Sequence, residues 1–310
     1  MSSIVVLLIG VLLLSTNVHS QNSVAITIDD VPNTRLFQKD GYQSRFLQKL
    51  DSLQIPMAIF INEHLVYKGD SLSKNYRLLS QWAVKELVTL GNHSYSHQRY
   101  SDTDFTEYST EVSKGEIMSK SLAKKYNKPL KYFRFPYNDL GKDSLQHHQG
   151  RSLLKVKGYE IAPFTIESSD WMYNRVYQHF LDQGEFEKAR EIGEAYVSKT
   201  LEYFDFFEDF ARKEYGRAVK HIYLCHDNAL NTDYLPLLIQ KLKERDYAFI
   251  SMEEAMTDPI YQQEDRYYKK WGVSWFYRWQ NTQKDRMTYM RQEPSTKQIM
   301  ALYESITSQK

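Results

Sequence analysis

Five short polar motifs lie along this chain, each at the end of an apolar run. They are Asp29-Asp30, His93-x-x-x-His97, Arg134-Phe135-Pro136-Tyr137, Asp170-Trp171 and Leu224-Cys225-His226-Asp227. Carboxylate and imidazole side chains bind divalent metal ions, and the same groups donate and accept protons in catalysis. Together the motifs therefore offer the parts of a metal site with an acid and a base beside it.

The first motif places two carboxylates side by side at the predicted end of a strand. Successive side chains of a strand point to opposite sides, so Asp29 and Asp30 can serve different partners, one a metal ion and the other water. An Asp-Asp pair on its own is also common in turns and helix caps. The pair gains meaning only together with the later motifs.

The second motif holds two histidines four residues apart. One helical turn or a tight loop would bring His93 and His97 to the same side, where both could bind one ion. One carboxylate and two imidazoles leave positions open for water and substrate, and they suit zinc, with cobalt, nickel or manganese as alternatives. The alternative reading is a pair of unrelated surface histidines. The hydroxyls of Ser94 and Ser96 are candidates for orienting these ligands.

Apolar runs rich in Val, Ile, Phe and Tyr predict buried strands at residues 24–28, 57–61, 131–135, 159–166, 221–225 and 247–250. Residues 43–53 and 105–126 predict helices between them, which favours a mostly parallel sheet. The polar motifs directly follow strands, so their side chains would gather on one rim. Active sites of parallel βα barrels lie at that rim, and a barrel explains the placement better than an open sheet.

The order and residue types of the motifs resemble the signature of the polysaccharide deacetylase family, also called the NodB-homology or carbohydrate esterase 4 family, over about residues 24–256. The resemblance implies an α/β fold, a distorted (β/α) barrel of about seven parallel strands. It implies a metal ion held by Asp30, His93 and His97. It further implies that Asp29 is the general base, oriented by Arg134, and that His226 is the general acid, kept charged by Asp170.

The same resemblance implies substrate contacts by Pro136, Tyr137, Trp171 and Leu224, with the Tyr137 backbone amide holding the oxyanion and Leu224 lining the acetyl-methyl pocket. The chain departs from the family pattern at Val31, where the family has Gly, and Val31 lacks the backbone freedom of Gly. Glu167 stands where the family usually has Asp. We expect no nucleophilic role for Cys225, because a metal-activated water needs no acyl-enzyme.

Two segments outside the motifs also carry expectations. Between Trp171 and Arg217, aromatic and aliphatic side chains recur at helical spacing and predict a helix covering the barrel rather than a partner-binding helix. From Asp258 onward the chain is rich in Tyr and Trp, which favours packing on the barrel, with stacking on sugars as the alternative. We expect a catalytic domain at residues 21–256 and an extension with helices at 257–310.

Lys and Arg number 40 against 39 Asp and Glu, so no strong field attracts nucleic acid or an anionic membrane. An apolar run over residues 4–14 predicts a signal peptide at 1–20, with an uncleaved anchor as the alternative and no transmembrane span in the mature chain. The single cysteine excludes an intramolecular disulfide.

These observations predict an exported, metal-dependent hydrolase that cleaves the linear amide of N-acetylated amino sugars in a polysaccharide of the chitin-oligomer or peptidoglycan type. One alternative is an esterase that removes O-acetyl groups from xylan or another glycan. A second is a non-catalytic carbohydrate-binding protein on the same fold, although retention of Asp29, Arg134, Asp170 and His226 speaks against it. The glycan and the oligomeric state stay open.

Overall fold

The computed structural model describes residues 21–69 and 71–308, and the predicted signal peptide lies outside them. The described strands form one parallel sheet in the order β5-β4-β3-β2-β1-β7-β6, with β8 paired to β1. Their bounds are β1 Ser23–Val31, β2 Met57–Ile61, β3 Val88–Asn92, β4 Leu130–Phe133, β5 Glu160–Ile161, β6 Ile166–Glu167, β7 Lys220–His226 and β8 Ala248–Phe249.

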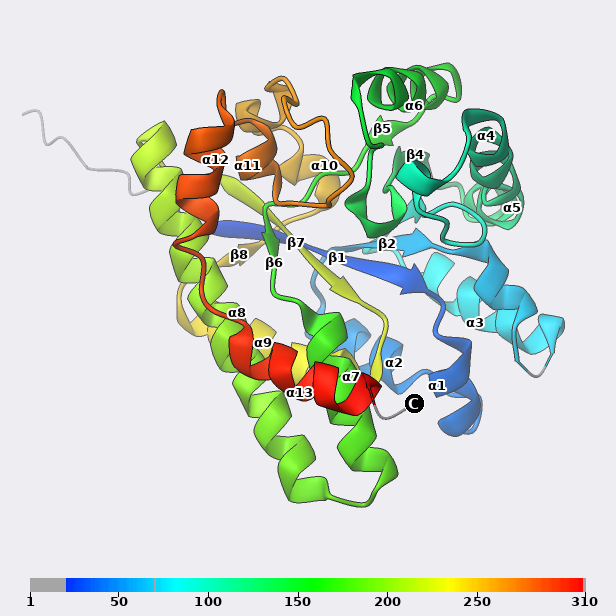
Figure 1. Cartoon of the computed structure of the whole chain (residues 1–310). Coiled ribbons are helices and arrows are strands. Elements are labelled where there is room, and N and C mark those ends of the chain that lie inside the picture. The colour runs from blue at the N-terminus through cyan, green and yellow to red at the C-terminus, as the bar shows by residue number, and fades with distance from the viewer. Residues whose placement is uncertain (1–20, 70, 309–310) are drawn as a thin grey trace, which may run out of the picture.

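The sheet curls into a half-barrel, which confirms the predicted distorted barrel (Figure 1). The edge strands of the sheet are β5 and β6, and residues 162–165 connect them. The Ala162 amide donates to the Phe133 carbonyl at 2.8 Å on one side, and the Thr165 amide donates to the Ile222 carbonyl at 2.9 Å on the other. The prediction of one strand at 159–166 is therefore wrong. Pro163, which has no N–H to donate, lies at the break.

Helices follow the strands and pack around the sheet (Figure 1). Those of the barrel are α1 Thr34–Lys39, α2 Arg45–Leu53, α3 Leu72–Ala83, α4 Phe105–Lys114, α5 Ile117–Lys125, α6 Ser144–Val156, α7 Asp170–Asp182, α8 Phe186–Tyr215, α9 Ala229–Glu244 and α10 Met252–Ala255.

The helix predicted at 105–126 is two helices, α4 and α5, separated at Gly115 and Glu116. A Cβ on Gly115 would lie 2.3 Å from the carbonyl carbon of Ser94, so only glycine allows this approach. The break therefore lets α4 and α5 close on the loop that carries the two motif histidines.

The residues that follow α10 contact the barrel helices α7 and α8. They include α11 Trp275–Arg278, α12 Gln283–Met290 and α13 Lys297–Thr307. The rings of Phe207 and Phe210 in α8 lie 5.7 Å and 4.8 Å from Phe276, and α13 lies against α7 (Figure 1). Half of the aromatic side chains of the extension are buried, whereas Trp271 and Tyr268 stay exposed.

The core consists of the strand side chains and the apolar faces of the surrounding helices. Strand β1 lies between β2 and β7 and is buried along almost its whole length. Among the described residues, no helix is long and apolar enough to cross a membrane.

Candidate metal and acid–base site

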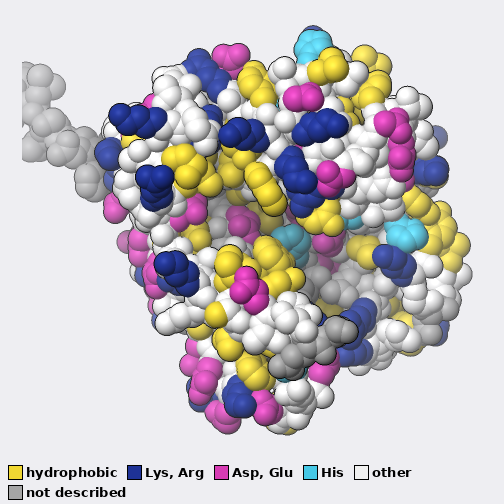
Figure 2. Space-filling model, viewed as in Figure 1, with side chains coloured by type: hydrophobic (Ala, Val, Ile, Leu, Met, Phe, Trp, Pro, Cys, Tyr) yellow, Lys and Arg dark blue, Asp and Glu magenta, His cyan; other side chains and the backbone are white. Residues whose placement is uncertain are grey.

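The motif residues come together at the carboxyl ends of the strands. Asp29 and Asp30 end β1, His93 and Arg134 follow β3 and β4, and His226 ends β7. Figure 2 shows this face of the molecule hollowed, with a histidine in the hollow and hydrophobic side chains on two sides of it. The predicted gathering on one rim is therefore what the fold produces.

Asp30, His93 and His97 form a group whose ligand atoms all lie within 4.8 Å of one another. The Asp30 Oδ1 atom lies 3.5 Å from His97 Nε2 and 3.9 Å from His93 Nε2. Two donors bound to one tetrahedral ion at zinc-type bond lengths would stand about 3.4 Å apart. The three predicted ligands therefore fit a divalent metal ion with little movement.

A backbone contact orients the first histidine. His93 Nδ1 lies 2.8 Å from the Arg134 carbonyl oxygen, and since a carbonyl only accepts, Nδ1 carries the proton. The Nε2 lone pair is then available to a metal ion. Such a second hydrogen bond is what usually sets the orientation of a metal-binding imidazole.

The second histidine lies in a tight loop rather than a helix. Ser94 and His97 both have left-handed backbone angles, with φ of 63° each. The buried Glu111 carboxylate on α4 accepts from Ser96 through the backbone N–H at 2.7 Å and through the hydroxyl at 2.6 Å. Burial, opposed in part by Asp30, lowers the pKa of His97 to about 4, so this imidazole is neutral and able to act as a ligand.

The departure at Val31 does not disturb the loop. The left-handed residue is Asp30 itself, with φ of 59°, while Val31 continues the strand with its side chain in the core. Asp tolerates this conformation better than most residues. Burial raises the pKa of Asp30, but His97, His93 and His226 outweigh that effect and the net direction is down, so the carboxylate stays ionised.

Asp29 is held by a buried arginine. Arg134 NH1 donates to Asp29 Oδ1 at 2.8 Å and to Thr27 Oγ1 at 2.7 Å. NH2 of the same guanidinium donates to the Pro163 carbonyl at 3.0 Å, so Arg134 also ties down the segment between β5 and β6. Both side chains are buried, and an ion pair of this kind fixes the direction of a carboxylate.

Distance alone does not show which of the two aspartates binds the metal ion and which acts as the base. His93 Nε2 lies 3.7 Å from Asp29 Oδ2, about as close as it lies to Asp30. The difference is the partner: Asp29 already accepts a charge-assisted hydrogen bond from Arg134, whereas Asp30 lies within reach of both histidines. This favours Asp30 as the metal ligand.

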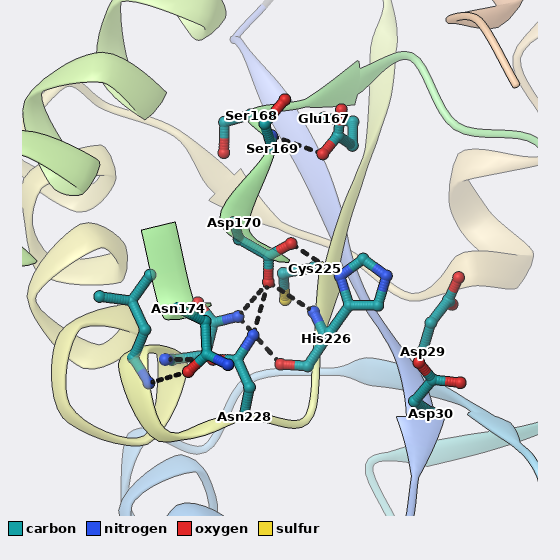
Figure 3. A network of polar contacts seen from close by, with 12 residues as sticks. Asp29, Asp30, Glu167, Ser168, Ser169, Asp170, Asn174, Cys225, His226 and Asn228 are labelled. Carbon is teal, nitrogen blue, oxygen red and sulfur yellow. Dashed lines mark hydrogen bonds and ion pairs between the residues drawn. The ribbon is translucent and has the colours of Figure 1, made fainter. Parts of the chain in front are cut away.

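His226 lies between Asp170 on one side and the two aspartates of β1 on the other (Figure 3). Its Nδ1 lies 2.7 Å from Asp170 Oδ1, and its backbone N–H donates to Asp170 Oδ2 at 2.9 Å. Burial alone would lower the pKa of His226, but the Asp170 carboxylate outweighs it and raises the pKa to about 10. The imidazolium is therefore the form present at neutral pH.

Two amides that were not singled out from the sequence complete this pair. Asn228 Nδ2 and Asn231 Nδ2 donate to Asp170 Oδ2 at 3.0 Å and 2.5 Å. Both lie just after the fifth motif, at the start of α9. Their spacing from His226 did not indicate a role, because their contact with Asp170 depends on how α7 packs on α9. Glu111 was likewise missed, for the same nonlocal reason.

A pocket of about 510 Å³ lies over these groups. Its lining includes both aspartates, both histidines, His226, Leu224, Tyr137 and Trp171, while Pro136 is buried outside the lining. A second hollow of about 600 Å³ shares Asp30, His97, Trp171 and His226 with it. Both volumes are in the range of small-ligand sites.

Glu167 and Cys225 also lie near the pocket. Burial and the nearby Asp170 raise the pKa of Glu167 to about 7, and its carboxylate accepts from the Ser169 amide at 2.5 Å. Cys225 is buried with its Sγ 3.5 Å from the Thr27 carbonyl, and burial raises the pKa of its thiol. A buried, protonated thiol is a poor nucleophile, in agreement with the expectation that Cys225 takes no such role.

Residues 16–151 match the sequence model of a family described as polysaccharide deacetylase. No curated protein matches the chain in sequence. A pseudoenzyme of the carbohydrate esterase 4 family from Bacillus anthracis aligns with a TM-score of 0.50 and 16% identity over 76% of this chain and 66% of its own.

A mutant of such a pseudoenzyme, described as having restored enzymatic activity, aligns with a TM-score of 0.50 and 17% identity over 76% of this chain and 68% of its own. A peptidoglycan deacetylase from Bacillus subtilis aligns with a TM-score of 0.45 and 17% identity over 76% and 92% of the two chains. The two alignments at 0.50 show a common fold.

Proposed function

Because the chain belongs to the polysaccharide deacetylase family, we propose that it is an active, metal-dependent enzyme that removes acetyl groups from N-acetylated amino sugars in a glycan. The main support for this proposal is that two hydrogen-bonded ion pairs border the same pocket. Asp29 with Arg134 lies on one side, and His226 with Asp170 lies on the other.

Family membership alone does not decide activity, since a pseudoenzyme shares this fold. The support for activity is the complete set of groups in this chain. Three ligands stand at distances that fit a divalent ion, and a fixed carboxylate and a charged imidazole border the same pocket. A binding protein without catalysis would have no need for this combination.

Asp30, His93 and His97 would hold the ion, and zinc suits the donor set best, with cobalt, nickel or manganese as alternatives. A bound divalent ion would supply Lewis acidity, which polarises an acetyl carbonyl and lowers the pKa of water toward about 7. The neutral His97 and the protonated Nδ1 of His93 leave lone pairs available for it.

Asp29 acts in this proposal as the general base. Arg134 holds its Oδ1, which leaves Oδ2 to accept the proton of the attacking water. The new bond joins the water oxygen to the acetyl carbon. The negative charge that develops on the acetyl oxygen would be met by the backbone amide of Tyr137, a residue held at φ of 57°.

His226 acts as the general acid. Asp170 occupies Nδ1, so Nε2 is the atom that donates a proton to the sugar nitrogen as the carbon–nitrogen bond breaks. An amine is a poor leaving group without that proton. The products are acetate and the free amino sugar, and Leu224 beside the site offers an apolar surface for the acetyl methyl group.

The test is release of acetate from N-acetylglucosamine oligomers, peptidoglycan and acetylxylan by the full chain, with and without a chelator. We expect release from N-acetylated glycans, its loss on chelation and its return when zinc is added. Release from acetylxylan alone would replace the proposal with an O-acetyl esterase. Absence of release from all three substrates, in a preparation shown to contain metal, would contradict enzymatic function.

We propose further that residues 1–20 direct export, that 21–256 form the catalytic domain and that 257–310 form an extension. The support for export is the apolar run at residues 4–14. Sequencing the amino terminus of protein recovered outside the producing cells checks it, and a terminus at Gln21 is the expected result.

A further inference from the structure

The C-terminal extension carries an exposed tryptophan into the pocket over the metal ligands. Residues 264–274, which we call the strap, cross the rim before α11 begins. Within the strap, Trp271 and Gly272 line the same pocket as Asp29, His93 and His226. No motif of the barrel includes this segment, and packing on the barrel accounts for its neighbours but not for Trp271.

The strap is fixed at its first end by a buried cluster of charges. Asp265 accepts from Arg278 NH2 at 2.7 Å and from Arg151 NH2 of α6 at 2.8 Å. Tyr268 lies with its ring 5.3 Å from that of His147, also on α6. Breaking such a buried pair leaves an uncompensated charge, so this end of the strap is held firmly to the barrel.

The second end is held by the backbone of the segment that precedes β6. Ser274 Oγ donates to the Thr165 carbonyl at 2.7 Å, and the Trp275 amide donates to the Phe164 carbonyl at 3.0 Å. Gly272 lies so close to Tyr137 that a Cβ would be 2.0 Å from its carbonyl oxygen. The strap therefore rests directly on the backbone that is proposed to hold the oxyanion.

Between these ends Trp271 is 61% exposed. Its neighbours are cations, with the Arg99 guanidinium 5.9 Å and the Lys270 ammonium 5.7 Å from the ring. Arg99 also covers the Tyr137 ring at 4.1 Å and donates to the Lys270 carbonyl at 3.4 Å. The indole thus lies beside two cations while much of its surface stays exposed.

The extension also supports the other aromatic residue of the pocket. Trp171, 47% exposed at the start of α7, meets the Tyr303 ring of α13 edge to face at 5.3 Å. Trp171 and Trp271 line one pocket and come from different segments, and the extension contacts the first and contains the second. Two exposed indoles beside the polar groups of the pocket suit a ligand with apolar faces and hydroxyl edges, which describes a pyranose ring.

We propose that Trp271 is a substrate-binding residue that stacks on a sugar ring next to the acetylated one, so that the strap forms a glycan subsite. This inference rests on the proposed function, because it takes the glycan to be the substrate of the adjacent site. In this proposal the strap favours longer chains, because Trp271 contacts the ring beyond the acetylated one.

The test measures binding separately from turnover. The tetramer and the monomer of N-acetylglucosamine are titrated calorimetrically into the Asp29→Asn protein, and then into the same protein carrying Trp271→Ala, Trp271→Phe or Tyr268→Ala. Trp271→Ala should weaken tetramer binding about three- to tenfold and leave monomer binding unchanged. Trp271→Phe should keep most of the affinity. Tyr268→Ala is the matched control, because Tyr268 is an exposed aromatic residue of the same strap outside the pocket.

Three results would overturn the subsite. They are unchanged tetramer binding in Trp271→Ala, equal weakening for monomer and tetramer, and absence of tetramer binding in the Asp29→Asn parent. Acetate release by the otherwise unchanged chain separates this inference from the proposed function. Tetramer binding that depends on Trp271 without acetate release would contradict the function alone, and acetate release with unchanged binding in Trp271→Ala would contradict the subsite alone.

Discussion

Arg134 NH1 donates to Asp29 Oδ1 at 2.8 Å, and both side chains are buried. The adjacent Asp30 has no such partner and lies instead within reach of His93 and His97. Two neighbouring carboxylates at the end of β1 thus have different surroundings. Such differences in surroundings allow two chemically identical groups to have separate roles in one site.

The first prediction follows from that difference. Asp29→Asn keeps the shape of the side chain but accepts protons poorly, so kcat should fall by about two to four orders of magnitude while metal content is unchanged. Asp30→Asn should lose metal. Elemental analysis of the purified variants, run beside acetate-release kinetics, checks both. Equal metal loss in the two variants would show that the aspartates act as one ligand pair.

The second prediction concerns the imidazole ligands. His93→Ala or His97→Ala reduces three protein ligands to two, so divalent-ion affinity should fall strongly. Competition with a chromogenic chelator measures the change. His148→Ala, a substitution of a histidine outside the cluster, is the control and should bind as the unchanged protein does. Retention of a stoichiometric ion at the same affinity in both ligand variants would place the metal elsewhere.

The third prediction tests the residue that orders the histidine loop. Glu111 accepts two hydrogen bonds from Ser96, between the two ligands. Glu111→Ala leaves the partly buried Ser96 N–H without its acceptor, and metal affinity should fall about 10–100-fold, as is usual when support of a ligand is removed. Glu107→Ala, one turn earlier on the exposed side of α4, should change nothing. Equal affinities in the two variants would mean that the loop holds its shape without Glu111.

Much of this site was predictable because its residues lie at strand ends, where the local pattern is strong. The strands β1, β2 and β7 are buried and mostly apolar, and the first and fifth motifs lie at the ends of β1 and β7. Once the sheet is parallel, its carboxyl ends meet and bring distant motifs together. Asp29 and His226 could therefore be placed near one another from the sequence, whereas β3, the strand that leads into His93, was not among the predicted strands.

The features that could not be predicted all depend on contacts between distant segments. The break between α4 and α5 exists because Gly115 approaches Ser94, and the supports of Asp170 depend on how α9 packs on α7. Trp271 looked like its buried neighbours, such as Trp275, in a segment rich in aromatic residues. Only the path of the strap over Tyr137 shows that Trp271 lines the pocket whereas Trp275 belongs to the core.

The fourth prediction uses that path. Gly272→Ala would place a Cβ 2.0 Å from the Tyr137 carbonyl oxygen, so the strap or the Tyr137 backbone must move. If the Tyr137 amide meets the developing oxyanion, kcat should fall about tenfold or more on a sugar amide and on an aryl acetate alike. Trp271→Ala, which removes the adjacent side chain without touching Tyr137, should spare the aryl acetate. An unchanged kcat in Gly272→Ala would separate the strap from the chemistry.

The fifth prediction concerns the acid and its pH dependence. Asp170 is the main cause that raises the pKa of His226, to about 10, against the lowering effect of burial. A general acid must be protonated, so activity is present below this pKa and is lost as pH rises through it. Asp170→Asn removes the raising cause, and the alkaline limb of the kcat/KM profile should move down by about 1–3 pH units.

The leaving group provides the control for this assignment. His226→Ala should reduce turnover of sugar amides much more than that of activated aryl acetates, because a phenolate departs with little protonation. Both substrates meet the same metal ligands and the same base, so a general loss of structure would affect them equally. An equal loss on the two substrates, or an alkaline limb that stays in place in Asp170→Asn, would leave His226 as a binding residue and require another group as the acid.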